Sequence, residues 1–298
     1  MPLSTAAARP LSRRAATLIG FTAILLWSTL ALATSSTGAV PPFLLTALTF
    51  AIGGSVGLVT ALVRGVGLGV LRQPWPVWLH GVGGLFGYHF FYFSALKLAP
   101  PAEAGLIAYL WPLLIVVFSA FLPGEKLRPA HIVGALMGLA GTVVLLGARA
   151  GGLGFAPEFV PGYLAAALCA VIWTLYSVGS RYFANVPTEV VAGFCLATAV
   201  LSAVCHALFE PSIWPAGAGE WLAVVALGIG PVGIAFYTWD IGMKRGDIRL
   251  LGVMSYAAPV LSTLLLVAAG FAALSWSLAA ACALIVGGAA VATLLARR

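Results

Sequence analysis

Residues 102–122 read AEAGLIAYLWPLLIVVFSAFL, and this stretch decides the class of fold. It contains one charged residue, Glu103, at its beginning. A helix needs roughly 20 apolar residues to cross the hydrocarbon core of a bilayer, and this run has that length. It is apolar on all sides, unlike the one-sided surface helix of a soluble domain. The stretch therefore predicts a transmembrane helix.

The composition extends this prediction to the whole chain. Of 298 residues, 62% are hydrophobic and 8% are charged, whereas a soluble domain carries about 25% charged residues. A water-facing fold is excluded, and so is a disordered chain, because apolar and aromatic residues are abundant. The net charge of +7 does not indicate a nucleic-acid partner, since the basic residues are scattered through short gaps between apolar runs.

The apolar runs predict an all-α polytopic membrane protein with ten transmembrane helices. Lipid-exposed spans must satisfy their own backbone groups, which helices do, and a β-barrel would alternate in polarity. The gaps between runs carry proline, glycine and most of the charges. The ten segments are 16–36, 42–63, 76–98, 102–122, 129–148, 160–183, 189–209, 218–243, 249–270 and 275–296.

The first run has some features of a cleavable signal. Three arginines precede it, and Ala31-Leu32-Ala33 resembles a cleavage site. The run is nevertheless as long as a full span, and a similar run recurs later in the chain. We expect it to be retained as the first span.

The distribution of lysine and arginine predicts the orientation. With the N-terminus in the cytoplasm, only Lys97 and Arg149 fall on the opposite side of the membrane. Such a bias indicates cytoplasmic N- and C-termini and an even number of spans. The thirteen residues on the cytoplasmic side are Arg9, Arg13, Arg14, Arg64, Arg72, Lys126, Arg128, Arg181, Lys244, Arg245, Arg249, Arg297 and Arg298.

The chain also contains an internal repeat at an offset of 147 residues. At this offset Tyr109-Leu110-Trp111-Pro112 falls on Tyr256-Ala257-Ala258-Pro259, and Gly141 falls on Gly288. Each half has five spans, an odd number, so the two halves would lie in opposite orientations. Inverted repeats of this kind are typical of secondary transporters.

The repeat divides the chain into four predicted parts. These are a cytoplasmic N-terminal segment (1–15), a first five-helix repeat (16–148), a periplasmic linker (149–159) and a second five-helix repeat (160–296).

With these features, the sequence resembles the EamA-type members of the drug/metabolite transporter superfamily. The resemblance covers about residues 16–296. One departure is that Gly124-Glu125 has no counterpart after the ninth segment, where 271–274 read FAAL. Within the family, the aromatic-rich spans are most similar to YddG-type aromatic amino acid exporters. The residues that carry the resemblance are Trp27-Ser28, Ala95-Leu96-Lys97, Tyr109 to Pro112, Gly124-Glu125, Gly134, Gly138, Gly141 and Trp173.

Polar and aromatic side chains inside the spans are the candidates for substrate contacts, because polar groups at membrane depth are costly and mark pathways. His89 lies near the middle of the third segment, between Tyr88 and Tyr92. It either faces substrate or packs against a neighbouring helix through a hydrogen bond. The predicted substrate-binding residues are Trp27, Tyr88, His89, Tyr109, Trp111, Trp173, Tyr176, Ser255 and Tyr256.

Two prolines at mid-span are repeat mates, Pro112 and Pro259. Each removes a backbone donor and frees the carbonyl four residues earlier. We predict that they act as hinges; a second possibility is that the freed carbonyls bind a substrate ammonium group, as unwound helices do in other carriers.

The sequence contains no enzyme motif, no catalytic residue and no metal-ligand spacing, and the four cysteines lie inside apolar runs. We expect no cofactor and no metal. The expected partners are the lipid bilayer and a small-molecule substrate; the sequence leaves the oligomeric state open, and a monomer is compatible with it.

The resemblance implies a secondary transporter that exports aromatic or neutral amino acids and related metabolites across the bacterial inner membrane by alternating access. Two alternatives stay open. One is an exporter of other small metabolites or drugs, and the other is a lipid-handling protein or scramblase.

Overall fold

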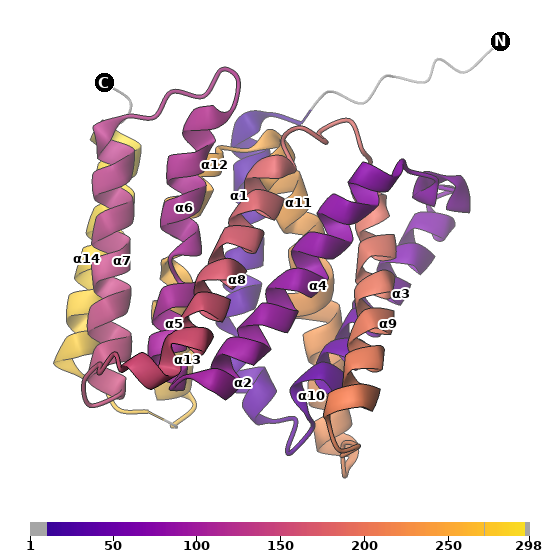
Figure 1. The fold of residues 1–298 in the computed structure, drawn as a ribbon. Helices are drawn as coiled ribbons and strands as arrows, with labels where there is room; N and C mark the ends of the chain where they lie inside the picture. Colours follow the sequence, from indigo (N-terminus) through magenta and orange to yellow (C-terminus); the bar gives the residue numbers. More distant parts are fainter. Residues whose placement is uncertain (1–10, 271, 296–298) are drawn as a thin grey trace.

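The computed structural model describes residues 11–270 and 272–295. These residues form a bundle of helices joined by short loops, and no β-strand occurs among them (Figure 1). Most of the segment 1–15 and the last arginines of the orientation argument lie outside the described residues.

The helices of the first half follow the predicted segments within a few residues. Prolines at the first or second helical position fix where α3, α4, α5 and α7 begin, because proline tolerates the unpaired first turn. The elements are α1 (Arg13–Ser28), α2 (Leu30–Ser35), α3 (Pro42–Val63), η1 (Leu68–Leu71), α4 (Trp75–Leu98), α5 (Pro101–Ala108), α6 (Trp111–Phe118), η2 (Ser119–Phe121) and α7 (Pro129–Arg149).

The second half repeats this pattern with similar lengths. Ser275 caps the last helix by accepting a hydrogen bond from the Leu278 amide at 3.2 Å. The elements are η3 (Pro157–Phe159), α8 (Val160–Gly179), η4 (Thr188–Val190), α9 (Val191–Phe209), α10 (Ala218–Ile229), η5 (Gly230–Ile234), α11 (Ala235–Arg245), α12 (Ile248–Met254), α13 (Ala257–Ala268) and α14 (Trp276–Leu294).

Among the described residues, nine helical segments are long and apolar enough to cross a membrane. They include every long helix except α4. That helix has 24 residues, so its length suffices, but its sequence is dominated by aromatic, glycine and histidine residues. The protein is therefore an all-helical, multi-pass membrane protein.

Helix pairing crosses between the two halves of the chain. The most extensive contacts join α7 with α14, α3 with α9, α4 with α8, and α1 with α11. Glycines allow close approach in two of these pairs. A Cβ added at Gly134 would lie 2.5 Å from the Gly288 carbonyl oxygen, and one added at Gly288 would lie 2.5 Å from that of Gly134. Similarly, Gly20 and Gly242 bring α1 and α11 into backbone contact.

Several spans are interrupted near their middle. The turn at Tyr109 and Leu110 separates α5 from α6, and the turn at Ser255 and Tyr256 separates α12 from α13. Both breaks precede the mid-span prolines. The segment predicted as a continuous helix over 218–243 also contains a π-helical turn, η5, between α10 and α11. Its glycines and Pro231 explain this, since proline cannot donate to the helical ladder.

Charged residues tie together the end of the bundle at which α1 begins and α14 ends, which we call the terminal end. Glu125, in the loop before α7, lies 3.1 Å from Arg13, 2.9 Å from Arg249 and 3.9 Å from Arg181. These arginines belong to α1, α12 and the segment after α8. The Glu125 side chain is 7% exposed. One carboxylate thus holds four separate elements together at this end.

Candidate substrate site

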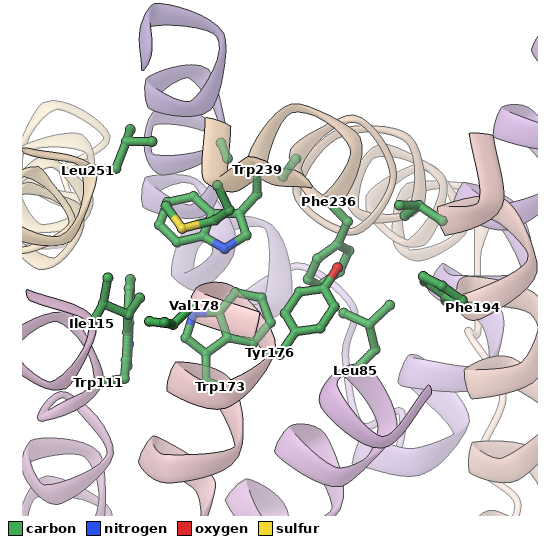
Figure 2. Close-up of a cluster of buried hydrophobic side chains, with 14 of the residues drawn as sticks. Leu85, Trp111, Ile115, Trp173, Tyr176, Val178, Phe194, Phe236, Trp239 and Leu251 are labelled. Carbon is green, nitrogen blue, oxygen red and sulfur yellow. The ribbon is translucent and has the colours of Figure 1, made fainter. Parts of the chain in front are cut away.

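Four tryptophans from four different helices meet in the centre of the bundle. Trp27 of α1 lies with its ring centroid 6.4 Å from Trp111 of α6 and 5.6 Å from Trp173 of α8. Trp239 of α11 completes the group, 5.0 Å from Trp27. Figure 2 shows Trp111, Trp173 and Trp239 gathered between their helices. We call these four residues the tryptophan cluster.

Two of the indole N–H groups are held by the protein. Trp239 donates to the Ser177 hydroxyl at 3.1 Å, and Trp27 donates to the Pro231 carbonyl at 3.0 Å. That carbonyl belongs to the π-helical turn. Buried indole N–H groups need such partners. The bonds therefore fix both rings and link α1 to the break between α10 and α11.

His89 adds a polar ring beside the cluster. Its Nδ1 lies 2.7 Å from the Leu85 carbonyl oxygen. Because a carbonyl only accepts, Nδ1 carries the proton and Nε2 of the neutral ring is an acceptor. The ring lies 5.0 Å from Phe50 and 6.4 Å from Phe236. The sequence allowed His89 either to face substrate or to bond to the protein. Its Nδ1 bonds within α4, whereas its Nε2 has no protein partner among the described residues.

The tyrosines Tyr88, Tyr92 and Tyr109 are half-buried. Tyr88 stacks on Tyr92 with centroids 5.8 Å apart, and lies 5.2 Å from Trp173. The hydroxyls of Tyr92 and Tyr109 make no hydrogen bond to a protein group in the described part of the chain. From Phe86 to Ser94 every residue of α4 is half-buried. These residues form the half of α4 away from the terminal end.

Tyr176 packs under the cluster, 5.3 Å from Trp173 and stacked on His80 at 5.2 Å. The side chain is buried, and its hydroxyl has no hydrogen-bond partner among the described residues. Gly84 on α4 makes room for this ring, since a Cβ there would lie 2.5 Å from it.

Two predicted site residues lie apart from the tryptophan cluster. Tyr256 belongs to a second apolar core with Val116 and Ile285, and its ring rests on Gly138. The Ser255 hydroxyl donates to the Leu251 carbonyl at 2.7 Å. Both side chains are buried.

The two mid-span breaks contact each other. The Leu113 amide follows Pro112 and donates to the Tyr256 hydroxyl at 3.2 Å. The Ser255 carbonyl, which Pro259 was expected to free, accepts from the Ala258 amide at 3.1 Å. A side chain from the break before Pro259 thus accepts a hydrogen bond from the backbone just after Pro112.

An internal ion pair lies next to the tryptophan cluster along α11. Asp240, one residue beyond Trp239, is buried and pairs with Lys244 at 2.9 Å and with the Thr188 hydroxyl at 2.6 Å. Lys244 also donates to the Val186 carbonyl at 2.8 Å. This ion pair is neutral overall and fastens α11 to the segment after α8.

Comparison with known proteins identifies the family. The model of the EamA-like transporter family matches residues 14–147 and matches again over 160–294. The chain belongs to this family. Its members named below are transporters, and this EamA-like protein is a transporter, not an enzyme.

Named relatives cover almost the whole length of this EamA-like chain. An aromatic amino acid exporter, YddG, from Ancylobacter novellus is 86% identical over 97% of this chain and 100% of its own. The YddG of Escherichia coli K12 is 27% identical over 97% of this chain and 100% of its own. A crystal structure with 85% identity superposes with a TM-score of 0.94 and covers 96% of this chain and 99% of that one. The resemblance expected from the sequence is therefore confirmed.

The sequence argument for this EamA-like chain missed several residues around the cluster. Phe50 and Phe236 stack at 5.3 Å beside His89, and Trp239 occupies the centre although it was assigned only to a span. A signal for two of them was present. The offset of 147 residues places Trp239 over Tyr92 and Phe236 over His89. For the π-helical turn that holds Trp27, Gly230, Pro231 and Gly233 signal a break in the helix. They do not signal that the Pro231 carbonyl would accept from Trp27, because that bond joins residues 204 positions apart.

Proposed function

We propose that this protein exports aromatic amino acids and related neutral metabolites across the bacterial inner membrane by alternating access. The observation that carries this is the tryptophan cluster, to which α1, α6, α8 and α11 each contribute one ring. The name of the 86% identical relative agrees with it.

The cluster and its neighbours suit an aromatic zwitterion. An aromatic ring gains from edge and offset contacts with Trp and Tyr, about 0.5–1.5 kcal/mol per pair beyond area burial. The Nε2 acceptor of His89 fits a substrate ammonium group. The hydroxyls of Tyr92 and Tyr109 fit the carboxylate as donors. No ionised side chain of the described residues belongs to the cluster, so a solute with net charge is disfavoured.

We further propose ten spans arranged as two inverted five-helix repeats, residues 16–148 and 160–296. In this arrangement α4 is the remaining span. Its aromatic residues lower its hydropathy, and the helix packs mainly against α8 and α9. The pairing of helices supports the repeat. The first span pairs with the eighth and the third with the sixth, as a two-fold exchange of halves requires. The contact of Gly134 with Gly288 also has a repeat mate. At the offset of 147 residues it maps onto Ala281 and Gly141, and a Cβ added at Gly141 would lie 3.1 Å from the Ala281 carbonyl oxygen.

We place both termini in the cytoplasm. The positive charge gathers at the terminal end, as the positive-inside rule expects. The carboxylate of Glu125 closes that end, whereas the half-buried stretch of α4 lies toward the other end. We propose that this conformation is closed at the cytoplasmic end. Pro112 and Pro259, next to the two bonded breaks, are the proposed hinges.

Counterflow of labelled phenylalanine into proteoliposomes tests the function. Unlabelled tyrosine, tryptophan and other neutral amino acids should inhibit uptake, and nucleotide sugars and cationic drugs should not. Uptake that is inhibited only by drugs would refute the amino acid assignment. Lipid transfer without phenylalanine uptake would instead indicate a lipid-handling protein.

A further inference from the structure

A second site is suggested by a cavity at the terminal end, away from the tryptophan cluster. The cavity measures about 320 Å³ and lies between the loop before α7, the beginning of α12 and the last turns of α14. It does not share a lining residue with the cluster. Its lining includes Lys126, Arg128, His131, Asp247, Arg249 and Thr293.

The charges that line this cavity favour an anion. Three cations, Lys126, Arg128 and Arg249, face a single carboxylate, Asp247. That carboxylate is already engaged: Oδ1 accepts from the Leu250 amide at 3.1 Å and Oδ2 lies 3.4 Å from Arg13. The charge of Arg249 is shared with Glu125 at 2.9 Å. Lys126 and Arg128 are exposed and form no ion pair among the described residues, so their charges remain for a ligand.

His131 contributes a directed donor. It is 7% exposed, and its Nδ1 accepts a hydrogen bond from the Arg128 amide at 3.1 Å. A ring whose Nδ1 accepts carries its proton on Nε2. The buried ring therefore supplies an N–H group at the cavity, and no protein acceptor for it occurs in the described part of the chain. An anion oxygen is the partner that such a donor fits.

The position of the cavity indicates a lipid as the source of the anion. Figure 1 shows α7 and α14 side by side at one margin of the bundle. The cavity lies where α7 begins and α14 ends. Their outer faces expose apolar side chains, with Val133 at 47%, Leu136 at 49%, Val286 at 69% and Leu294 at 62%. Acyl chains would lie along these faces while the headgroup reaches the cavity. A free phosphate would make no use of that apolar surface.

We propose that this cavity binds the phosphate of an anionic phospholipid headgroup, of the phosphatidylglycerol type. Lys126, Arg128 and the His131 Nε2–H hold the phosphate oxygens, and the acyl chains pack on α7 and α14. Basic pockets between transmembrane helices recognise anionic headgroups through the same chemistry.

Lipid binding to the full chain in detergent, followed by native mass spectrometry, tests this. Phosphatidylglycerol and phosphatidylcholine of equal chain length are titrated, since the second carries a phosphate but no net charge. The test variant is Lys126→Gln/Arg128→Gln. Its control, Arg72→Gln/Arg245→Gln, removes two exposed cations that do not line the cavity.

We expect phosphatidylglycerol to bind more tightly than phosphatidylcholine. Each lysine or arginine near an anionic lipid contributes about fivefold in affinity, so the test variant should lose roughly thirtyfold. The control should retain wild-type binding. Equal binding of the two lipids, or equal losses in both variants, would overturn the proposal. Displacement of phosphatidylglycerol by millimolar inorganic phosphate would also overturn it and assign the cavity to a soluble phosphate compound.

Discussion

The same substitution, tyrosine to phenylalanine, should change the stability of the protein in opposite directions at two buried positions. Tyr176→Phe and Tyr256→Phe each remove one hydroxyl oxygen from a side chain that is at most 2% exposed. The Tyr176 hydroxyl has no partner among the described residues, whereas the Tyr256 hydroxyl accepts from the Leu113 amide at 3.2 Å. The environment of the oxygen, not the size of the ring, should therefore decide the effect on stability.

The magnitudes follow from the hydrogen bonds. An unpaired buried polar group costs about 1–3 kcal/mol, and the Tyr176 ring is packed between Gly84, Trp173 and His80. Tyr176→Phe should raise the free energy of unfolding by about 1 kcal/mol. Tyr256→Phe should lower it by about 1 kcal/mol, because it leaves the Leu113 amide unpaired. The two variants should differ by about 2 kcal/mol in all.

Thermal unfolding of the purified proteins in one detergent, followed by intrinsic fluorescence, measures this difference. We expect the melting temperature to rise for Tyr176→Phe and to fall for Tyr256→Phe. A fall of similar size in both variants would refute the reasoning, because it would show that the Tyr176 hydroxyl is satisfied.

Three further changes test the substrate site and the helix packing. His89→Ala should lower transport without lowering the yield of folded protein, since it removes the Nε2 acceptor; proteoliposome uptake at normal rates would remove His89 from the site. Trp111→Ala should weaken uptake of phenylalanine more than uptake of alanine, and an equal loss for both would indicate a packing role. Gly134→Ala should cost about 1–3 kcal/mol of stability, because its Cβ would lie 2.5 Å from a backbone oxygen of α14. Gly83→Ala is its control and should leave the melting temperature unchanged or slightly higher, since its nearest neighbour would be 4.0 Å away.

Helix positions were largely predictable from the sequence because strong local signals bound them. The predicted segment 42–63 has the same bounds as α3 (Pro42–Val63), and the predicted segment 129–148 ends one residue before α7 does (Pro129–Arg149). In both, proline fixes the first turn and an apolar run of bilayer length follows. The predicted membership of the EamA family was also correct, because its motifs extend over the whole chain.

The arrangement within the spans was harder to predict because it depends on tertiary contacts. Helical periodicity predicts where side chains point only along an unbroken helix. The spans that contain Trp111, Tyr256 and Trp239 are all interrupted. Trp27, Trp111 and Trp173 were predicted at the site and do meet. Tyr256 lies instead in another apolar core, where it bonds to the neighbouring break.

Substrate protection of a single cysteine tests the central claim most directly. Tyr92→Cys is made in a variant whose four native cysteines are replaced, and right-side-out vesicles are treated with a membrane-impermeant maleimide. Lys97→Cys, at the exposed end of the same helix, is the control. We predict that phenylalanine slows labelling at position 92 more than alanine does, and leaves position 97 unaffected. Labelling at position 92 that phenylalanine does not slow, or that alanine slows equally, would contradict an aromatic substrate site at the tryptophan cluster.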